Sequence, residues 1–203
     1  MLSIILRYFV KGESNVNDTK SRNITYNCSK KVGILNRTFA DLTRIINNGL
    51  IIFLTMLMTG KNNRIADSAM LDTMPEHRDY TESAGVLIGN NNRIFDLVTI
   101  SGGTISHTYI GNNCMILAKA HISHDCMIFD NVVISAGVIL GGSVHVGEGT
   151  NIGMGAIVHQ GVKIPDGCMI GMGTIITKKT ELKPNGKYVG NPARYIGENT
   201  RTA

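Results

Sequence analysis

The 203-residue sequence has no tryptophan, 5% aromatic residues, four prolines and few charged residues (17%). Its longest apolar stretch runs only from Leu50 to Met58, whereas a membrane-spanning helix needs about 20 residues. The net charge of +5 is scattered, without the concentrated basic face that nucleic-acid binding needs. We therefore expect a cytoplasmic protein with no membrane span and no nucleic-acid partner.

Cysteine usage excludes the common zinc and redox motifs. The four cysteines, Cys28, Cys114, Cys126 and Cys168, show no CxxC spacing. What the sequence does contain is glycine, 23 residues in all, which suits tight turns better than helices because glycine costs about 1 kcal/mol inside a helix.

A repeat of six residues dominates the chain. Every sixth residue from Ile110 to Leu182 is a branched aliphatic, and a small residue often follows four positions later, with Cys114, Cys126 and Cys168 in that second register. A period of six does not match the 3.6 residues of an α-helix, but it fits short strands joined by sharp turns, three to each coil of a parallel β-helix. The sequence thus predicts an all-β fold, a left-handed parallel β-helix of hexapeptide repeats with a short C-terminal tail.

The register continues upstream with two interruptions, a polar excursion over Asp72–Leu87 and a four-residue insertion within Gly102–Tyr109. Residues 1–50 do not follow the repeat. We therefore predict an uncertain N-terminal segment over residues 1–50, a β-helix domain over residues 51–182, and a C-terminal cap over residues 183–203.

The richest group of polar side chains is the segment AHISHDC, residues 120–126. Its His121, His124 and Asp125 fall at or near a turn, where side chains can project outward. A neutral imidazole can take a proton from a hydroxyl or amine that attacks a carbonyl, and a neighbouring carboxylate can orient the ring. Two interpretations stay open, a catalytic base with its orienting partner or a set of solvated turn residues.

Stacking places a second histidine on the same side of the β-helix. Residues 18 positions apart lie above one another, so His159 stands in one column with Ser123 and Gly141, about 10 Å from the first cluster. Gly141 and Gly142 leave an open shelf between the two, which can admit a thin ligand arm. The alternative is a hydrogen-bonded turn histidine.

Metal binding is not expected. His121 and His124 have HxxH spacing, and stacking brings no third histidine into reach.

Three segments carry a resemblance to a known family: GNNNRIFDLVTISGGT, IGNNCMILAKAHISHDC and LGGSVHVGEGTNIGMGAIVHQ. They are similar to the UDP-N-acetylglucosamine acyltransferases of lipid A biosynthesis and to related hexapeptide sugar acyltransferases. The similarity extends from about Gly60 to Gly197, and its specific parts are HxxHDC and VHQ. The segment YVGNPARYIG resembles the closing segment of hexapeptide sugar transferases that use acetyl-CoA.

The resemblance implies roles for individual residues. His124 is expected to be the general base and Asp125 its orienting partner. The expected substrate-binding residues are His121, Ser143, His159, Gln160, Glu76 and Asp79, with Ser143 standing where the lipid A enzyme has a further histidine. The expected donor-binding residues are Gly142, Lys178, Lys179, Asn191 and Arg194; the basic ones among them either meet the phosphates of coenzyme A or the acidic surface of an acyl carrier protein, or form a solubilising cap.

The leading functional hypothesis is an acyltransferase that moves a short acyl group from a thioester, acetyl-CoA in the first instance, to a hydroxyl or amine of a nucleotide-linked sugar for cell-surface polysaccharide or lipopolysaccharide. No permanently bound cofactor is expected, acyl-CoA or acyl carrier protein being the donor. The resemblance also implies a homotrimer with sites between subunits. One alternative is the acyl-[acyl carrier protein]–UDP-N-acetylglucosamine O-acyltransferase of lipid A biosynthesis. An alternative of another class is a non-catalytic β-helix scaffold.

Overall fold

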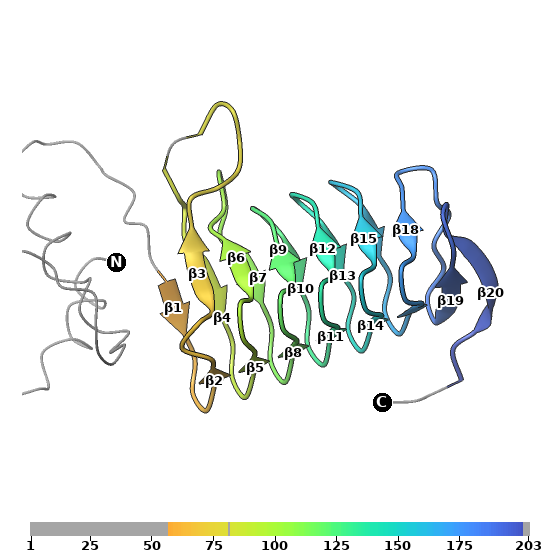
Figure 1. The fold of residues 1–203 in the computed structure, drawn as a ribbon, viewed down its shortest axis with the longest axis horizontal. Coiled ribbons are helices and arrows are strands. Elements are labelled where there is room, and N and C mark those ends of the chain that lie inside the picture. Colours follow the sequence, from red (N-terminus) through yellow and green to blue (C-terminus); the bar gives the residue numbers. More distant parts are fainter. Residues whose placement is uncertain (1–56, 81, 201–203) are drawn as a thin grey trace, which may run out of the picture. The chain divides into compact units, whose positions relative to one another are not determined.

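The computed structural model describes residues 57–80 and 82–200, and all their regular structure is β (Figure 1). The predicted segment 1–50 and Cys28 lie outside the described residues. In the part of the chain that the structure describes, no helix is long and apolar enough to cross a membrane.

Short strands form three sheets, and the chain visits them in turn. Sheet A consists of β1 (Leu57–Thr59), β4 (Val86–Ile88), β7 (Thr108–Ile110), β10 (Met127–Ile128), β13 (His145–Val146) and β16 (Lys163–Ile164). Sheet B consists of β2 (Arg64–Ile65), β5 (Arg93–Ile94), β8 (Met115–Ile116), β11 (Val133–Ile134), β14 (Asn151–Ile152), β17 (Met169–Ile170), β19 (Gly186–Val189) and β20 (Arg194–Glu198). Sheet C consists of β3 (Met70–Thr73), β6 (Thr99–Ser101), β9 (His121–Ile122), β12 (Ile139–Leu140), β15 (Ile157–Val158) and β18 (Ile175–Ile176).

Strand pairing follows the predicted repeat. Ile122 pairs with Leu140 and Leu140 with Val158, each 18 residues further along the chain and parallel. The side chains of the sixth-residue register point inward, and Ile110, Ile134 and Ile170, for example, are fully buried. Burying each such side chain contributes about 1.5–3 kcal/mol. The predicted all-β parallel β-helix of hexapeptide repeats is therefore confirmed.

The turns depend on one residue with left-handed backbone. The third residue after each core aliphatic has a positive φ, and this holds without exception from Asn113 to Gly173. Asparagine, aspartate and glycine tolerate this conformation best, which accounts for the polar residues and glycines that recur there.

The cysteines of the repeat pack in the interior. Cys114, Cys126 and Cys168 are free thiols and almost fully buried. Burial raises the pKa of Cys114 to about 11 and that of Cys126 to about 12, so both remain protonated at neutral pH. They are packing residues, as their register predicts.

Two loops leave the β-helix at the same corner, between sheets C and A. The first joins β3 to β4 and the second joins β6 to β7; the first is the larger loop beside β3 in Figure 1. The turn of the HxxHDC segment joins β9 to β10 and so lies at this corner as well. The C/A corner is therefore where the regular repeat is interrupted and where its richest polar segment lies.

Near the end of the chain, β19 continues sheet B in parallel to β17, and β20 turns back antiparallel to β19. Tyr188 of β19 is 1% exposed, and its hydroxyl accepts a hydrogen bond from the Lys183 amide at 2.5 Å. An aromatic ring thus fills the interior at the last coil, within the stretch predicted as a cap.

Candidate active site

His124 and Asp125 occupy the turn between β9 and β10. Asp125 has the positive φ (57°) of the turn position, and this bends its carboxylate back toward the preceding ring. His124 Nδ1 lies 2.8 Å from Asp125 Oδ2. The imidazole is outside the core of the β-helix yet only 6% exposed, because neighbouring loops cover it.

The Asp125 carboxylate is held by the loop between β6 and β7. It accepts hydrogen bonds from the Thr104 amide (2.8 Å) and the Thr104 hydroxyl (2.6 Å), and longer ones from the amides of Ile105 (3.3 Å) and Ser106 (3.4 Å). Burial opposes ionisation, but the hydrogen bonds from Thr104 and His124 outweigh it and hold the pKa of Asp125 below its ordinary value. The ionised carboxylate can only accept, so the proton sits on His124 Nδ1 and the lone pair on Nε2.

Gly142 supplies the surface on which the imidazole rests. A Cβ atom at this position would come within 2.5 Å of both Cε1 and Nε2 of His124. The turns of other coils carry Ala118, Ala136 and Gln160 at the equivalent position, so the turn itself does not require glycine there. The glycine is required by the histidine one coil below.

The loop between β3 and β4 covers the two histidines of HxxH. The rings of His77 and His124 are perpendicular, with centroids 5.4 Å apart. Glu76 Oε2 lies 3.7 Å from His121 Nε2, and His121 Nδ1 shares a 2.7 Å hydrogen bond with the Thr99 hydroxyl. Asp79 contributes its amide, which donates to His77 Nδ1 at 3.2 Å.

Most of the other expected residues share the C/A corner without contacting His124. Gly142, Gln160 and Lys178 follow His124 at intervals of 18 residues, and Ser143 and Lys179 follow Asp125 at intervals of 18 and 54, so they stand in two columns with about 4.8 Å between coils. The Ser143 amide donates to the His124 carbonyl at 2.9 Å. Gln160 and Lys178 are exposed along the corner.

The remaining expected residues lie further toward the C-terminus. His159 is exposed, and its Nδ1 lies 3.0 Å from the Gln160 carbonyl oxygen. Asn191 and Arg194 are exposed in and after the turn between β19 and β20. None of these three contacts His124 or Asp125 within residues 57–80 and 82–200.

Sequence reasoning missed Thr99 and Thr104. Neither falls in a motif, and the only signal for Thr104 is its place in the insertion that interrupts the repeat. In the described residues no group of three or more His, Cys, Asp or Glu side chains could hold a metal ion.

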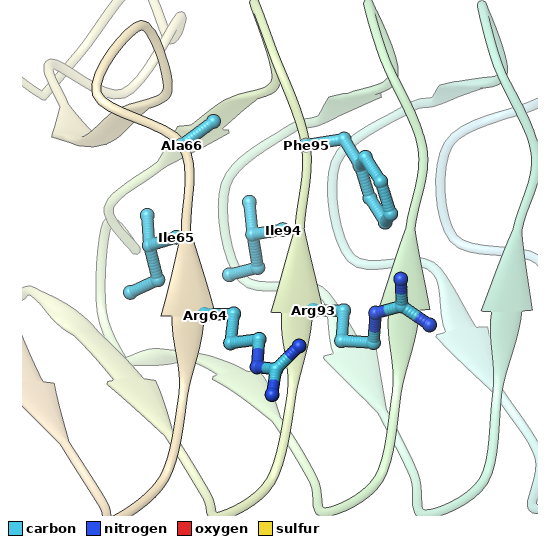
Figure 2. A pocket seen from close by; sticks show the side chains of 6 residues that line it. All are labelled: Arg64, Ile65, Ala66, Arg93, Ile94 and Phe95. Atoms are coloured by element: carbon cyan, nitrogen blue, oxygen red, sulfur yellow. The ribbon is translucent and has the colours of Figure 1, made fainter.

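A shallow pocket of about 310 Å³ lies elsewhere, on sheet B (Figure 2). It is lined by Arg64, Ile65, Ala66, Arg93, Ile94 and Phe95. Sheet B is the side of the triangular coil opposite the C/A corner, so this pocket is separate from the histidine site.

Comparison with known proteins defines the class first. Residues 107–142 match the family described as bacterial transferase hexapeptide (six repeats), and residues 143–178 match the hexapeptide repeat of succinyl-transferase. Together with the three parallel sheets, these matches make the chain a β-helix protein of the hexapeptide-repeat transferase class.

Within that class the chain resembles one kind of enzyme. It is 39% identical over 90 residues to acyl-[acyl-carrier-protein]–UDP-N-acetylglucosamine O-acyltransferase of Gloeothece citriformis, covering 43% of this chain and 33% of that protein. The UDP-N-acetylglucosamine O-acyltransferase of Moraxella catarrhalis is 32% identical in structure-based comparison, with a TM-score of 0.66 over 70% of this chain and 57% of that one. The corresponding values for the Campylobacter jejuni enzyme are 30%, 0.63, 70% and 63%. The chain is thus a hexapeptide-repeat protein resembling UDP-N-acetylglucosamine acyltransferases, and it spans about a third of the length of the curated relatives it matches.

Proposed function

We propose that this protein transfers an acyl group from an acyl carrier protein to a hydroxyl of UDP-N-acetylglucosamine or a closely related nucleotide sugar. The observation that carries the proposal is the His124–Asp125 pair at the C/A corner, packed on Gly142. The named relatives favour a carrier-protein donor over the acetyl-CoA that the C-terminal segment suggested. The likeness to a Bacillus cereus N-acyltransferase solved with dTDP and coenzyme A, at 23% identity, concerns the fold alone.

The geometry of the pair supports a general-base mechanism. Nε2 of His124 takes the proton of the sugar hydroxyl while the oxygen attacks the thioester carbonyl carbon. The resulting imidazolium is stabilised by the Asp125 carboxylate at Nδ1. When the tetrahedral intermediate collapses, the carbon–sulfur bond breaks, and the imidazolium returns its proton to the leaving thiolate. The products are the acylated sugar and the free thiol of the carrier.

The tetrahedral oxyanion needs a hydrogen-bond donor close to the base. The Gly142 amide donates no hydrogen bond within the described residues, and the atoms of this glycine touch the His124 ring. We assign this amide to the oxyanion, because a preorganised backbone N–H is well suited to developing negative charge.

Donor binding belongs to the C-terminal end of the C/A corner. Lys178 and Lys179 are exposed two coils beyond Gly142, and Arg194 is exposed on β20. Positive charge at this end suits the acidic surface of a carrier protein. A homotrimer in the cytoplasm is part of the same proposal.

The proposal is tested with a panel of donors. Wild-type protein is incubated with UDP-N-acetylglucosamine and either acetyl-CoA or acyl carrier protein loaded with acyl chains of different lengths, and the acylated sugar is quantified. We expect product only with the carrier-bound donors. Product with acetyl-CoA alone would reinstate the first hypothesis, and the absence of product with every donor and several nucleotide sugars would favour a non-catalytic scaffold.

A further inference from the structure

The loop that covers the C/A corner is fixed in a way that aims one side chain at the proposed base. The His77 amide donates to the Pro75 carbonyl at 2.8 Å, and Pro75 is buried. The Asp79 amide donates to His77 Nδ1 at 3.2 Å, so the proton of the neutral His77 ring sits on Nε2. Both the backbone and the ring of His77 are therefore held by the loop's own hydrogen bonds.

His77 lies between two aromatic partners. Its ring is perpendicular to that of His124 at 5.4 Å and inclined by 66° to that of Tyr80 at 4.9 Å. Edge-to-face pairs at these separations are favourable and orient the rings. The imidazole of His124 is thereby restrained in three ways: Asp125 bonds Nδ1, Gly142 lies against the ring, and His77 stands across it.

The neighbouring residue of the loop contacts the other histidine of HxxH. Glu76 reaches His121, which Thr99 braces from the far side. Glu76 is 71% exposed, so this ion pair contributes little to stability by itself. Two consecutive loop residues thus meet both histidines, and the less exposed contact is the one made by His77.

We infer that His77 is a positioning residue for His124: its ring keeps the His124 imidazole at the angle from which Nε2 meets the sugar hydroxyl. This role rests on the proposed function, but it differs from contacting the sugar. A residue that only binds substrate changes KM, whereas one that holds the base changes kcat, since misalignment of a reacting group slows the chemical step.

The first test is kinetic. For His77→Ala we expect kcat to fall about tenfold while KM for the nucleotide sugar changes less than about twofold. His77→Phe keeps a ring across His124 and restores most of kcat. His107→Ala, which removes an exposed imidazole from the other loop at this corner, is the matched control and retains wild-type kinetics. An unchanged kcat in His77→Ala, a rise in KM alone, or a Phe variant as slow as the Ala variant would each overturn the assignment.

The second test does not depend on activity. In protein labelled with [15N]histidine, the ring signals of His124 are identified by their loss in His124→Ala. We expect His77→Ala to shift or broaden those signals and His107→Ala to leave them unchanged. If wild-type protein proves inactive, the proposed function fails while this spectrum still reports on the contact; if His124 signals are the same in His77→Ala, the positioning role fails whatever the activity.

Discussion

Asp125 Oδ2 lies 2.8 Å from Nδ1 of His124, the residue directly before it in the sequence. Side chains of adjacent residues in an extended strand point to opposite faces and do not meet. They meet here because Asp125 occupies the left-handed turn position, with φ of 57°, which folds its carboxylate back onto the preceding ring. The repeat thus builds a histidine–carboxylate pair from two consecutive residues.

The Asp125 carboxylate is expected to stabilise the folded protein in a pH-dependent way. Its pKa is lower in the folded state, so its contribution is present above the ordinary aspartate pKa of about 3.9 and is lost as the pH falls through the folded-state value. We expect Asp125→Asn to be less stable than wild type at pH 7, with the difference shrinking below about pH 4. Denaturant unfolding at pH 3–7 measures this.

The control for that experiment is Asp67→Asn, at an exposed carboxylate that makes no hydrogen bond within the described residues. A difference between wild type and Asp125→Asn that stays constant down to pH 3 would mean that the ionised carboxylate has no part in stability.

Gly142 and His124 are expected to be coupled in stability. In the wild-type background, Gly142→Ala places a methyl group against the His124 ring and should destabilise the fold by about 1–3 kcal/mol, as overpacking does. In a His124→Ala background the space is free, and the same change should cost much less. A double-mutant cycle of unfolding free energies measures the coupling; additive effects would show that the ring does not rest on this glycine.

Thr104 is expected to act through Asp125. Thr104→Val keeps the shape of the side chain and removes the hydroxyl that donates to Oδ2 at 2.6 Å. The loss of one hydrogen bond to a charged group should destabilise the protein by about 1.5–3 kcal/mol and lower the rate of acyl transfer. Thr104→Ser, which retains the hydroxyl, is the matched control, and equal behaviour of the two variants would contradict this role.

The coils could be predicted from the sequence because each is specified locally. Ile122, Leu140 and Val158 lie 18 residues apart, and the same period predicts both their burial and their pairing. The turn position of His124 and Asp125 follows from that register too. What the period cannot supply is the conformation of segments that break it.

The contacts of His77 and Thr104 with the site belong to those segments. Both lie in loops that leave the C/A corner, and their place over His124 and Asp125 depends on loop hydrogen bonds such as that from Asp79 to His77. Glu76 was expected to contact the sugar; in the structure it lies beside His121, and its role toward substrate stays a prediction.

The central claim is that His124 is the base of an acyl transfer, and the most direct measurement compares wild type with His124→Ala. Both are assayed with UDP-N-acetylglucosamine and acyl-loaded carrier protein, with circular dichroism and the unfolding temperature as controls for the fold. We expect the variant to keep the β-helix and to lose on the order of 10²-fold or more in kcat. A correctly folded His124→Ala protein that turns over at the wild-type rate would contradict the claim.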